Sequence, residues 1–251
     1  MTVPRFYHPQ EMEAGQTVSL AGDNIHYAQR VLRMRSGDRL DLIDGLGSEY
    51  HAVVHFLSPE KVLVDITEKI RIVDPSVGLT FCQSLLKADK MDFIVQRSVE
   101  LGVDTFIPFV SSRSVVRLTP VAAVRKVERW QKIAKEAARQ CGRSHIPTVE
   151  PVAAYSDMIR MANGNPVKAI FWEAETERTL RQLFQSGEGR SDDRYFFVVG
   201  PEGGFSGEEI CRAKEAGFLS VSIGKRVLKV ETAVMSILAI LQYERGIFHG
   251  D

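Results

Sequence analysis

The sequence contains little cysteine and no long apolar run. Its 251 residues include three cysteines, Cys82, Cys141 and Cys211, which lie far apart and form no Cys-x-x-Cys pair. An odd, scattered set of thiols argues against a disulfide framework and a zinc site, and is typical of a reducing cytosol. No stretch approaches the roughly 18 apolar residues of a membrane helix, and the first residues lack the apolar core of a signal peptide. We therefore expect a soluble, cytoplasmic protein that binds no metal.

The short motifs of several large enzyme classes are also missing. The six histidines form no His-Glu-x-x-His pattern, and neither Gly-x-Ser-x-Gly nor Gly-x-x-x-x-Gly-Lys-[Ser/Thr] occurs. Zinc enzymes, hydrolases and P-loop enzymes therefore lack their minimum chemistry here. The glycine-rich run at residues 200–204 lies late in the chain and has the wrong spacing for a dinucleotide-binding fingerprint.

The chain has no net charge, since 32 basic side chains balance 32 acidic ones. Residues 73–160 carry 13 basic against 9 acidic side chains, a local net charge of +4. A positive field of this kind can position a phosphate backbone, but it is also an ordinary fluctuation over a segment of this length. The charge distribution therefore leaves nucleic-acid binding open.

The first 72 residues have the pattern of a small β-barrel. Short, partly alternating apolar runs separated by turn residues predict strands at 17–20, 39–43, 52–56 and 62–66. One helix is expected over residues 24–33. Several short strands at this spacing favour a barrel, and Asp74-Pro75 indicates a domain boundary near residue 73.

Strands alternate with longer helices in the rest of the chain. We predict strands at 79–82, 103–110, 167–172, 195–199 and 219–223, and helices at 91–101, 119–143, 206–216 and 232–243. Asp89 is the expected N-cap of the first of these helices. This order is typical of an α/β domain with a mostly parallel sheet covered by helices on both faces.

A glycine-rich loop at residues 200–204 is the strongest local signal. The buried strand 195–199 leads directly into it, and a helix capped by Ser206 follows. Ligands of open parallel sheets bind at the carboxyl ends of strands, and glycines let backbone groups approach them closely. A tight turn without a ligand explains the pattern equally well. Glu208 and Glu209 in the first turn of the helix argue against an anionic phosphate there.

A second loop, at residues 223–230, joins another strand to the last helix. It contains Lys225, Arg226 and Lys229, and Glu231 follows. A solvated basic loop is the more common structure for such a run. The helix at 232–243 is apolar nearly all round, which favours burial on both sides, for example in a subunit interface.

The long helix at 119–143 has one basic face. Its members follow helical steps: Arg125, Arg129, Lys132, Lys135, Arg139 and Arg143. Glu128 and Glu136 partly neutralise them. A solvated, salt-bridged face is therefore the favoured interpretation over a surface that follows phosphates.

Taken together, the motifs follow one another in an order that is itself specific, although each is weak alone. They are Arg5-Phe6-Tyr7, His26, Val31-Leu32-Arg33, Gly37-Asp38, Asp44-Gly45, Lys87-Ala88-Asp89-Lys90-Met91-Asp92, Glu100-Leu101-Gly102-Val103, Arg129-Trp130-Gln131-Lys132-Ile133-Ala134, Glu136-Ala137-Ala138, Gln140-Cys141-Gly142-Arg143, Pro147, Gly200-Pro201-Glu202-Gly203-Gly204 and the segment 228–232. On these residues, nearly the whole chain resembles the bacterial 16S ribosomal RNA uracil-N3 methyltransferases of the SPOUT superfamily.

The resemblance implies a fold and an activity. Residues 1–72 would form a PUA-like β-barrel that binds RNA, and residues 73–251 a SPOUT methyltransferase domain closed by a trefoil knot. The cofactor would be S-adenosyl-L-methionine. The substrate would be N3 of a uridine in 16S rRNA of the small ribosomal subunit, uridine 1498 of the decoding region. The family's pattern further implies a homodimer packed through the C-terminal helix, with no metal and no membrane contact.

The resemblance also implies site residues. The predicted cofactor-binding residues are Phe171, Trp172, Glu173, Val199, Gly200, Pro201, Glu202, Gly203, Gly204, Ile223, Gly224, Val227, Leu228 and Val230. The predicted RNA-binding residues are Arg5, Arg30, Arg33, Lys87, Lys90, Arg113 and Arg143. Arg226 and Lys229 would stabilise the uracil anion, and Glu231 is a candidate proton acceptor. Family members commonly have arginine and threonine where this chain has Lys229 and Val230, and often an acid before the arginine that corresponds to Arg113.

Other functions compatible with the residues stay open. A catalytically silent RNA-binding module would bind rRNA but not the cofactor. An enzyme of nucleotide or phosphate metabolism would use the 200–204 loop and ignore RNA. A related SPOUT methyltransferase would modify a different RNA position.

Overall fold

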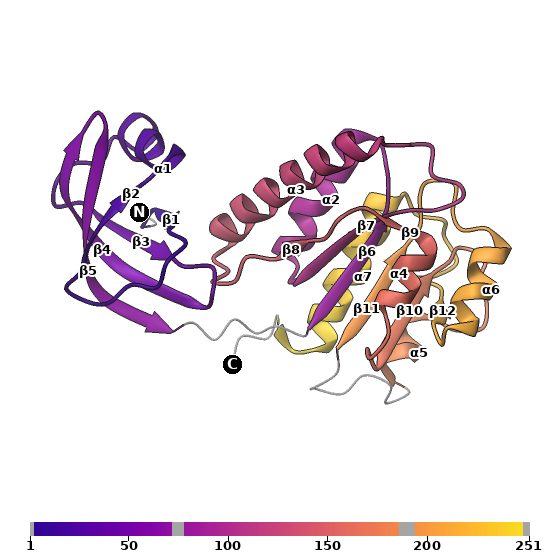
Figure 1. Ribbon diagram of the computed structural model, residues 1–251. Coiled ribbons are helices and arrows are strands. Elements are labelled where there is room, and N and C mark those ends of the chain that lie inside the picture. The colour runs from indigo at the N-terminus through magenta and orange to yellow at the C-terminus, as the bar shows by residue number, and fades with distance from the viewer. Residues whose placement is uncertain (1–2, 72–77, 186–193, 248–251) are drawn as a thin grey trace. The chain divides into compact units, whose positions relative to one another are not determined.

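In the computed structural model, the chain folds into two compact units (Figure 1). The structure describes residues 3–71, 78–185 and 194–247. The first unit comprises Met1–Asp74 together with Ala138–Ile146, and the second comprises Pro75–Ala137 together with Pro147–Asp251. Arg139 illustrates why the short segment groups with the first unit, since its Nη1 donates to the Arg5 carbonyl at 2.7 Å. The division into two domains at residue 72 stays a prediction.

A five-stranded sheet forms the first unit, in the order β1-β3-β4-β5-β2. Its strands are β1 (Arg5–Tyr7), β2 (Thr17–Leu20), β3 (Arg39–Ile43), β4 (Ser48–Ser58) and β5 (Lys61–Arg71). The sheet curls around its own core (Figure 1), because alternate residues such as Leu42, Tyr50 and Val64 face inward and are fully buried. The predicted β-rich first part is confirmed.

The single helix predicted over residues 24–33 is wrong in part. A short helix, α1 (Asp23–His26), continues into a wider π-helical turn at Tyr27–Val31. Arg33 then adopts a left-handed backbone with φ of 53°, which no helix can continue. The helical pattern of apolar residues could not indicate this change, because both helix types bury nearly the same face.

A seven-stranded sheet forms the second unit, and every strand pair in it is parallel. The order is β12-β10-β11-β6-β7-β8, with β9 also beside β7. The strands are β6 (Leu79–Ser84), β7 (Thr105–Val110), β8 (Thr148–Val149), β9 (Ala153–Ala154), β10 (Val167–Phe171), β11 (Tyr195–Val199) and β12 (Leu219–Val221). The predicted parallel sheet is confirmed, and the trefoil knot stays a prediction.

Helices cover the sheet of the second unit. They are α2 (Ala88–Glu100), α3 (Pro120–Cys141), α4 (Tyr155–Met161), α5 (Leu180–Gln185), α6 (Gly207–Glu215) and α7 (Val230–Glu244). All five residues of β11 are buried, as expected for a central strand with both faces covered. On one face, Phe196 packs in a cluster with Met158 of α4 and Ile210 of α6.

Two helix starts test the capping predictions. Ser206 caps α6 as expected: its Oγ accepts from the Glu209 backbone N–H, and the Glu209 carboxylate accepts from the Ser206 N–H. The prediction for α2 is wrong, because Lys87 occupies the N-cap and Asp89 lies inside the first turn. Asp89 remains favourable there, since an acid in the first turn complements the helix dipole.

Among the described residues, no helix is both long and apolar enough to span a bilayer.

Candidate active site

Three loops of the second unit meet at one edge of its sheet. Strands β12, β10 and β11 are neighbours and run in parallel, so the loops that follow them emerge on the same side. The register aligns Val221, Phe171, Val199 and Gln83 in one row across β12, β10, β11 and β6. The first three of these residues line a cleft of about 230 Å³ that opens to solvent.

This cleft contains all of the predicted cofactor-binding residues. Its walls are residues 171–173 after β10, residues 199–205 after β11, residues 221–228 after β12, and Val230 and Ala233 of α7. The residues that the family resemblance predicts thus line one cleft at the carboxyl ends of three neighbouring strands.

The 200–204 loop is fixed by backbone contacts. The Gly204 N–H donates to the Pro201 carbonyl at 2.9 Å, and φ of Gly204 is 66°, a conformation that favours glycine. The Gly200 carbonyl accepts from Gln83 Nε2 at 3.0 Å. A Cβ at Gly204 would lie 2.8 Å from Glu173 Cδ, so the Glu173 carboxyl group rests directly against the loop.

Gln83 was not among the predicted site residues. Its side chain is fully buried near the end of β6, and its Oε1 has no hydrogen-bond partner in the described part of the chain. Glutamine in the middle of an apolar strand is a signal that sequence reading could have used, because a buried amide needs a partner. Here that partner is the backbone of the loop that lines the cleft.

Exposed cations occupy the wall formed by the 222–229 loop. Arg226 lines the cleft, and its side chain is exposed. Lys229 is the N-cap residue of α7 and is also exposed, but it is not part of the cleft lining. Gly224, with φ of 134°, supplies the backbone conformation that turns this loop.

Glu231 is held by a partner on another helix. Its Oε1 lies 3.3 Å from Lys90 Nζ, and the same ammonium lies 3.1 Å from Glu202 Oε1. The backbone N–H of Glu231 and the charge of Lys90 hold the pKa of the Glu231 carboxyl below its usual value. The hydrogen bonds that the Lys90 ammonium donates to the Glu202 and Glu231 carboxylates raise the pKa of Lys90.

A buried polar network supports the loop that follows β7. The Glu209 carboxylate accepts hydrogen bonds from the Ser112 backbone N–H and from Ser112 Oγ, both at 2.8 Å. Below this loop, Ser84 Oγ lies 2.7 Å from Ser114 Oγ, and both serines are buried. The loop is therefore fixed to the start of α6.

Arg113 extends from this loop toward the cleft. Its Nη1 donates to the Gly203 carbonyl at 3.0 Å, and the side chain is otherwise exposed. The predicted RNA-binding residue Arg113 thus lies beside the lining loop. Lys87, the N-cap residue of α2 in the same unit, is also exposed.

The predicted RNA-binding arginines near the N-terminus differ in exposure. Arg30 and Arg33 are exposed. Arg5 forms an ion pair with Glu49, with Nη2 and Oε2 2.7 Å apart. Arg143 belongs to the same unit and is 8% exposed, whereas a phosphate contact needs an exposed guanidinium. The structure therefore does not favour Arg143 as an RNA contact.

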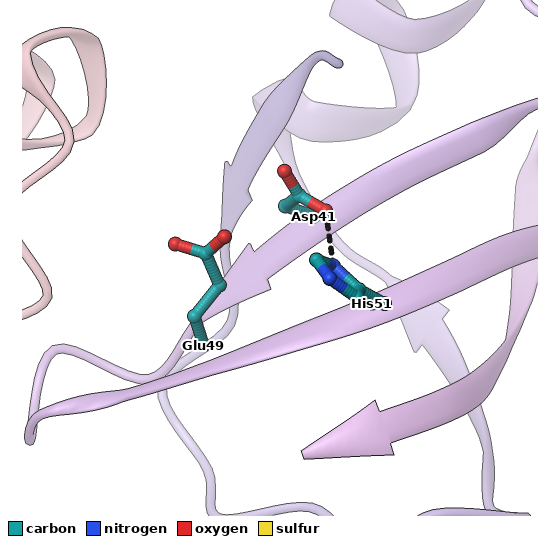
Figure 2. A group of neighbouring side chains, drawn as sticks. All are labelled: Asp41, Glu49 and His51. Carbon is teal, nitrogen blue, oxygen red and sulfur yellow. Dashed lines mark hydrogen bonds and ion pairs between the residues drawn. The ribbon is translucent and has the colours of Figure 1, made fainter. Parts of the chain in front are cut away.

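Three ionisable side chains of the first unit bring together atoms of the kinds that bind metal ions. Figure 2 shows Asp41, Glu49 and His51 on β3 and β4, with His51 Nδ1 2.8 Å from Asp41 Oδ1. Glu49 is already paired with Arg5. Each carboxylate thus has a protein partner, and a guanidinium beside the group disfavours a further cation.

Comparison with known proteins agrees with this geometry. A family model described as an RNA methyltransferase domain matches residues 74–242, and one described as an RNA methyltransferase PUA domain matches residues 20–67. Ribosomal RNA small subunit methyltransferase E of Bacillus subtilis (strain 168) is 30% identical over 247 residues, covering 96% of each chain.

Two solved structures are similar over almost their whole length. A methyltransferase from Legionella pneumophila, in complex with the bound cofactor SAM, has a TM-score of 0.87 and 30% identity, covering 97% of this chain and 98% of that chain. Ribosomal RNA small subunit methyltransferase E from Neisseria gonorrhoeae, bound to S-adenosyl methionine, has a TM-score of 0.85 and 33% identity, covering 96% and 97%. The chain belongs to the family of ribosomal RNA small subunit methyltransferases E.

Proposed function

We propose that this protein transfers the methyl group of S-adenosylmethionine to N3 of a uridine in 16S rRNA, and that the uridine is 1498 of the small-subunit decoding region. The observation that carries the proposal is the cleft built by three adjacent carboxyl-end loops, in a chain whose relatives have been solved with this cofactor. Family resemblance alone supports the choice of nucleotide.

The residues of the cleft fit this cofactor. Phe171, Val199 and Val221 give it an apolar floor, and the glycines of the 200–204 loop leave backbone groups accessible. Glu173 and Glu202 place carboxylates at a site for a molecule that carries a sulfonium cation. The bound cofactor supplies an electrophilic methyl group, so the protein mainly has to orient the reacting atoms.

The protein must also stabilise charge on the base. Uracil N3 carries a proton, and the anion left by its loss is stabilised by a nearby cation. Arg226 is exposed on the cleft wall, so it serves this role, and Lys229 at the start of α7 assists. Glu231 is a poor proton acceptor, because its pKa is lowered and Lys90 occupies its Oε1. The base must be unpaired or flipped to reach the cleft.

Exposed cations in each unit bind the RNA backbone. Arg30 and Arg33 serve in the first unit, and Lys87 and Arg113 in the second. Such contacts fix the position of the substrate without reading its sequence.

The protein works as a homodimer through the outer face of α7. Ile237 and Leu241 are fully buried within the single chain, whereas Ile240 is 40% exposed, beside the face of the helix that they bury. Tyr243, three residues further along the same helix, is 56% exposed, so two neighbouring large side chains of this apolar helix support an interface there.

Calorimetry with S-adenosylmethionine, followed by methyl transfer to small ribosomal subunits, tests the proposed function. Mass spectrometry of digested rRNA then identifies the modified nucleotide. Cofactor binding with methylation at uridine N3 is the expected result. RNA binding without cofactor affinity would instead identify a silent RNA-binding module. Nucleotide binding without RNA affinity would identify an enzyme of nucleotide or phosphate metabolism. Methylation at another position would identify a different RNA target.

A further inference from the structure

Lys90 joins two walls of the cleft, although it does not line the cleft itself. Its Nζ lies 3.1 Å from Glu202 Oε1 and 3.3 Å from Glu231 Oε1. Glu202 is part of the lining loop after β11, and Glu231 follows Val230, the first lining residue of α7. One ammonium group therefore links the 200–204 loop to the first turn of α7.

Lys90 pairs with both carboxylates, whereas the backbone N–H of Glu231 and the charge of Lys229 act on Glu231. Glu231 Oε2 is buried and has no hydrogen-bond partner among the described residues. The Glu231 side chain is 23% exposed, that of Glu202 38% and that of Lys90 34%, so water screens the group only in part. Without Lys90, two like charges would face each other across a short gap, and the loop and the helix would repel.

The other end of the same helix pair is fixed independently. Gln242 Nε2, near the end of α7, donates to the Leu101 carbonyl at the end of α2 at 2.8 Å. Helices α2 and α7 pack together, and their starts meet at Lys90 and Glu231. The Lys90 bridge is therefore the contact that sets the start of α7, which is the end that borders the cleft.

We propose that Lys90 is a positioning residue of the cofactor cleft, which holds the 200–204 loop against the first turn of α7. In this role Lys90 does not contact an RNA phosphate. The family resemblance predicts that both Lys87 and Lys90 bind RNA, and only Lys87 keeps that role. The inference rests on the proposed function of the cleft. Its ammonium group already has two carboxylate partners, whereas Lys87 is exposed at the N-cap of the same helix.

Calorimetric titration of S-adenosylmethionine tests this role in the full-length chain, with Lys87→Met as the matched control. Lys90→Met should raise the cofactor Kd about three- to tenfold, as expected for the loss of one or two partly exposed ion pairs. Lys90→Arg should stay within about twofold of the wild type, because a guanidinium keeps the positive charge and can bond both carboxylates. Lys87→Met should leave the cofactor Kd unchanged.

A double-mutant cycle separates the bridge from a general loss of structure. Glu231→Gln should also raise the Kd for S-adenosylmethionine. Lys90→Met should then raise this Kd by a smaller factor in the Glu231→Gln background than in the wild type. The salt dependence of RNA binding should be the same for Lys90→Met and the wild type.

The outcomes distinguish a failure of the proposed function from a failure of the proposed role of Lys90. A wild-type protein that binds no S-adenosylmethionine would overturn the proposed function, and the role of Lys90 with it. Wild-type binding together with an unchanged Kd in Lys90→Met, or additive effects in the cycle, would overturn the role of Lys90 alone. A flatter salt dependence in Lys90→Met would identify a phosphate contact instead.

Discussion

The Glu209 carboxylate accepts a hydrogen bond from the Ser112 backbone N–H at 2.8 Å, although 97 residues separate the two in sequence. The same carboxylate also closes the capping box of α6 through the Ser206 N–H, at 2.9 Å. One buried side chain thus fixes both the start of α6 and the loop that carries Arg113 toward the cleft.

Glu209→Ala should therefore destabilise the protein strongly. It leaves the Ser112 and Ser206 donors without their acceptor and removes a helix cap contact, which together predict a loss of about 2–4 kcal/mol in the free energy of unfolding. Urea denaturation measures it. Glu208→Ala is the matched control in the same turn, because it removes only an exposed pair with Arg212. Equal losses in the two variants would show that the network and the cap together contribute no more than one exposed ion pair.

Gly204→Ala should weaken cofactor binding while the protein stays folded. A side chain at φ of 66° is strained, and the new Cβ would displace the Glu173 carboxyl group from the loop. We expect at least a tenfold rise in the calorimetric Kd for S-adenosylmethionine, corresponding to about 1.4 kcal/mol.

Gly207→Ala is the control for this variant, because a Cβ there meets nothing within 4 Å. Gly203→Ala should also be mild, since its Cβ would lie 3.4 Å from Arg113 Cβ, an ordinary contact. Normal cofactor affinity in folded Gly204→Ala would contradict the placement of this loop.

Ile240→Asp should produce monomers, since a carboxylate would be desolvated in the proposed interface. Sedimentation at micromolar concentration measures the change. Val121→Asp is a suitable control, because Val121 is 64% exposed on α3, away from α7 in sequence. Ile237→Asp should fail to fold instead, as Ile237 is fully buried in the single chain. A monomeric wild-type protein would refute the dimer.

The Lys90 bridge should contribute equally to cofactor binding from about pH 6 to pH 9. The pKa of Glu231 is lowered from 4.5, so its contribution is present above that value and lost only as the pH falls through the still lower folded pKa. The pKa of Lys90 is raised from 10.5, so its contribution is lost only above that value. Lys229, which also faces Glu231, favours the charged carboxylate too.

The ratio of cofactor Kd between Glu231→Gln and the wild type should therefore be constant at pH 6, 7.5 and 9. A ratio that changes within this range would mean that Glu231 titrates there and is available as a proton acceptor.

Arg30→Ala should weaken RNA binding without changing cofactor affinity. Each lost phosphate contact reduces the slope of log affinity against log salt concentration by roughly 0.7 to 0.9. Arg33→Asn is the companion variant, because asparagine tolerates the left-handed backbone found there. Unchanged slopes in both variants would exclude these arginines from the RNA surface.

Much of this architecture could be predicted because its signals are local. Strand β11 is a continuous apolar run that ends in glycine, and Ser206 with Glu209 has the spacing of a capping box. Periodicity and capping depend on neighbours in sequence, so the parallel sheet and the 200–204 loop follow from them.

The rest depends on contacts between distant residues. No local pattern brings Ser112 to Glu209, or Lys90 to both Glu202 and Glu231. The sequence of α7 has no amphipathic pattern, because the helix is apolar nearly all round. It therefore does not indicate which apolar residues face the core of their own chain. The structure buries Ile237 within the single chain and leaves Ile240 exposed.

Helix α7 borders the cleft with its first turn and exposes Ile240 on its outer face. In a dimer built through that face, subunit association and cofactor binding both act on one element fixed at its two ends by Lys90 and Leu101. Thermodynamic linkage then requires each equilibrium to shift the other by the same factor. We expect the dimer dissociation constant to fall when saturating S-adenosylmethionine is added. Equal dissociation constants with and without the cofactor would show that α7 does not couple subunit association to cofactor binding.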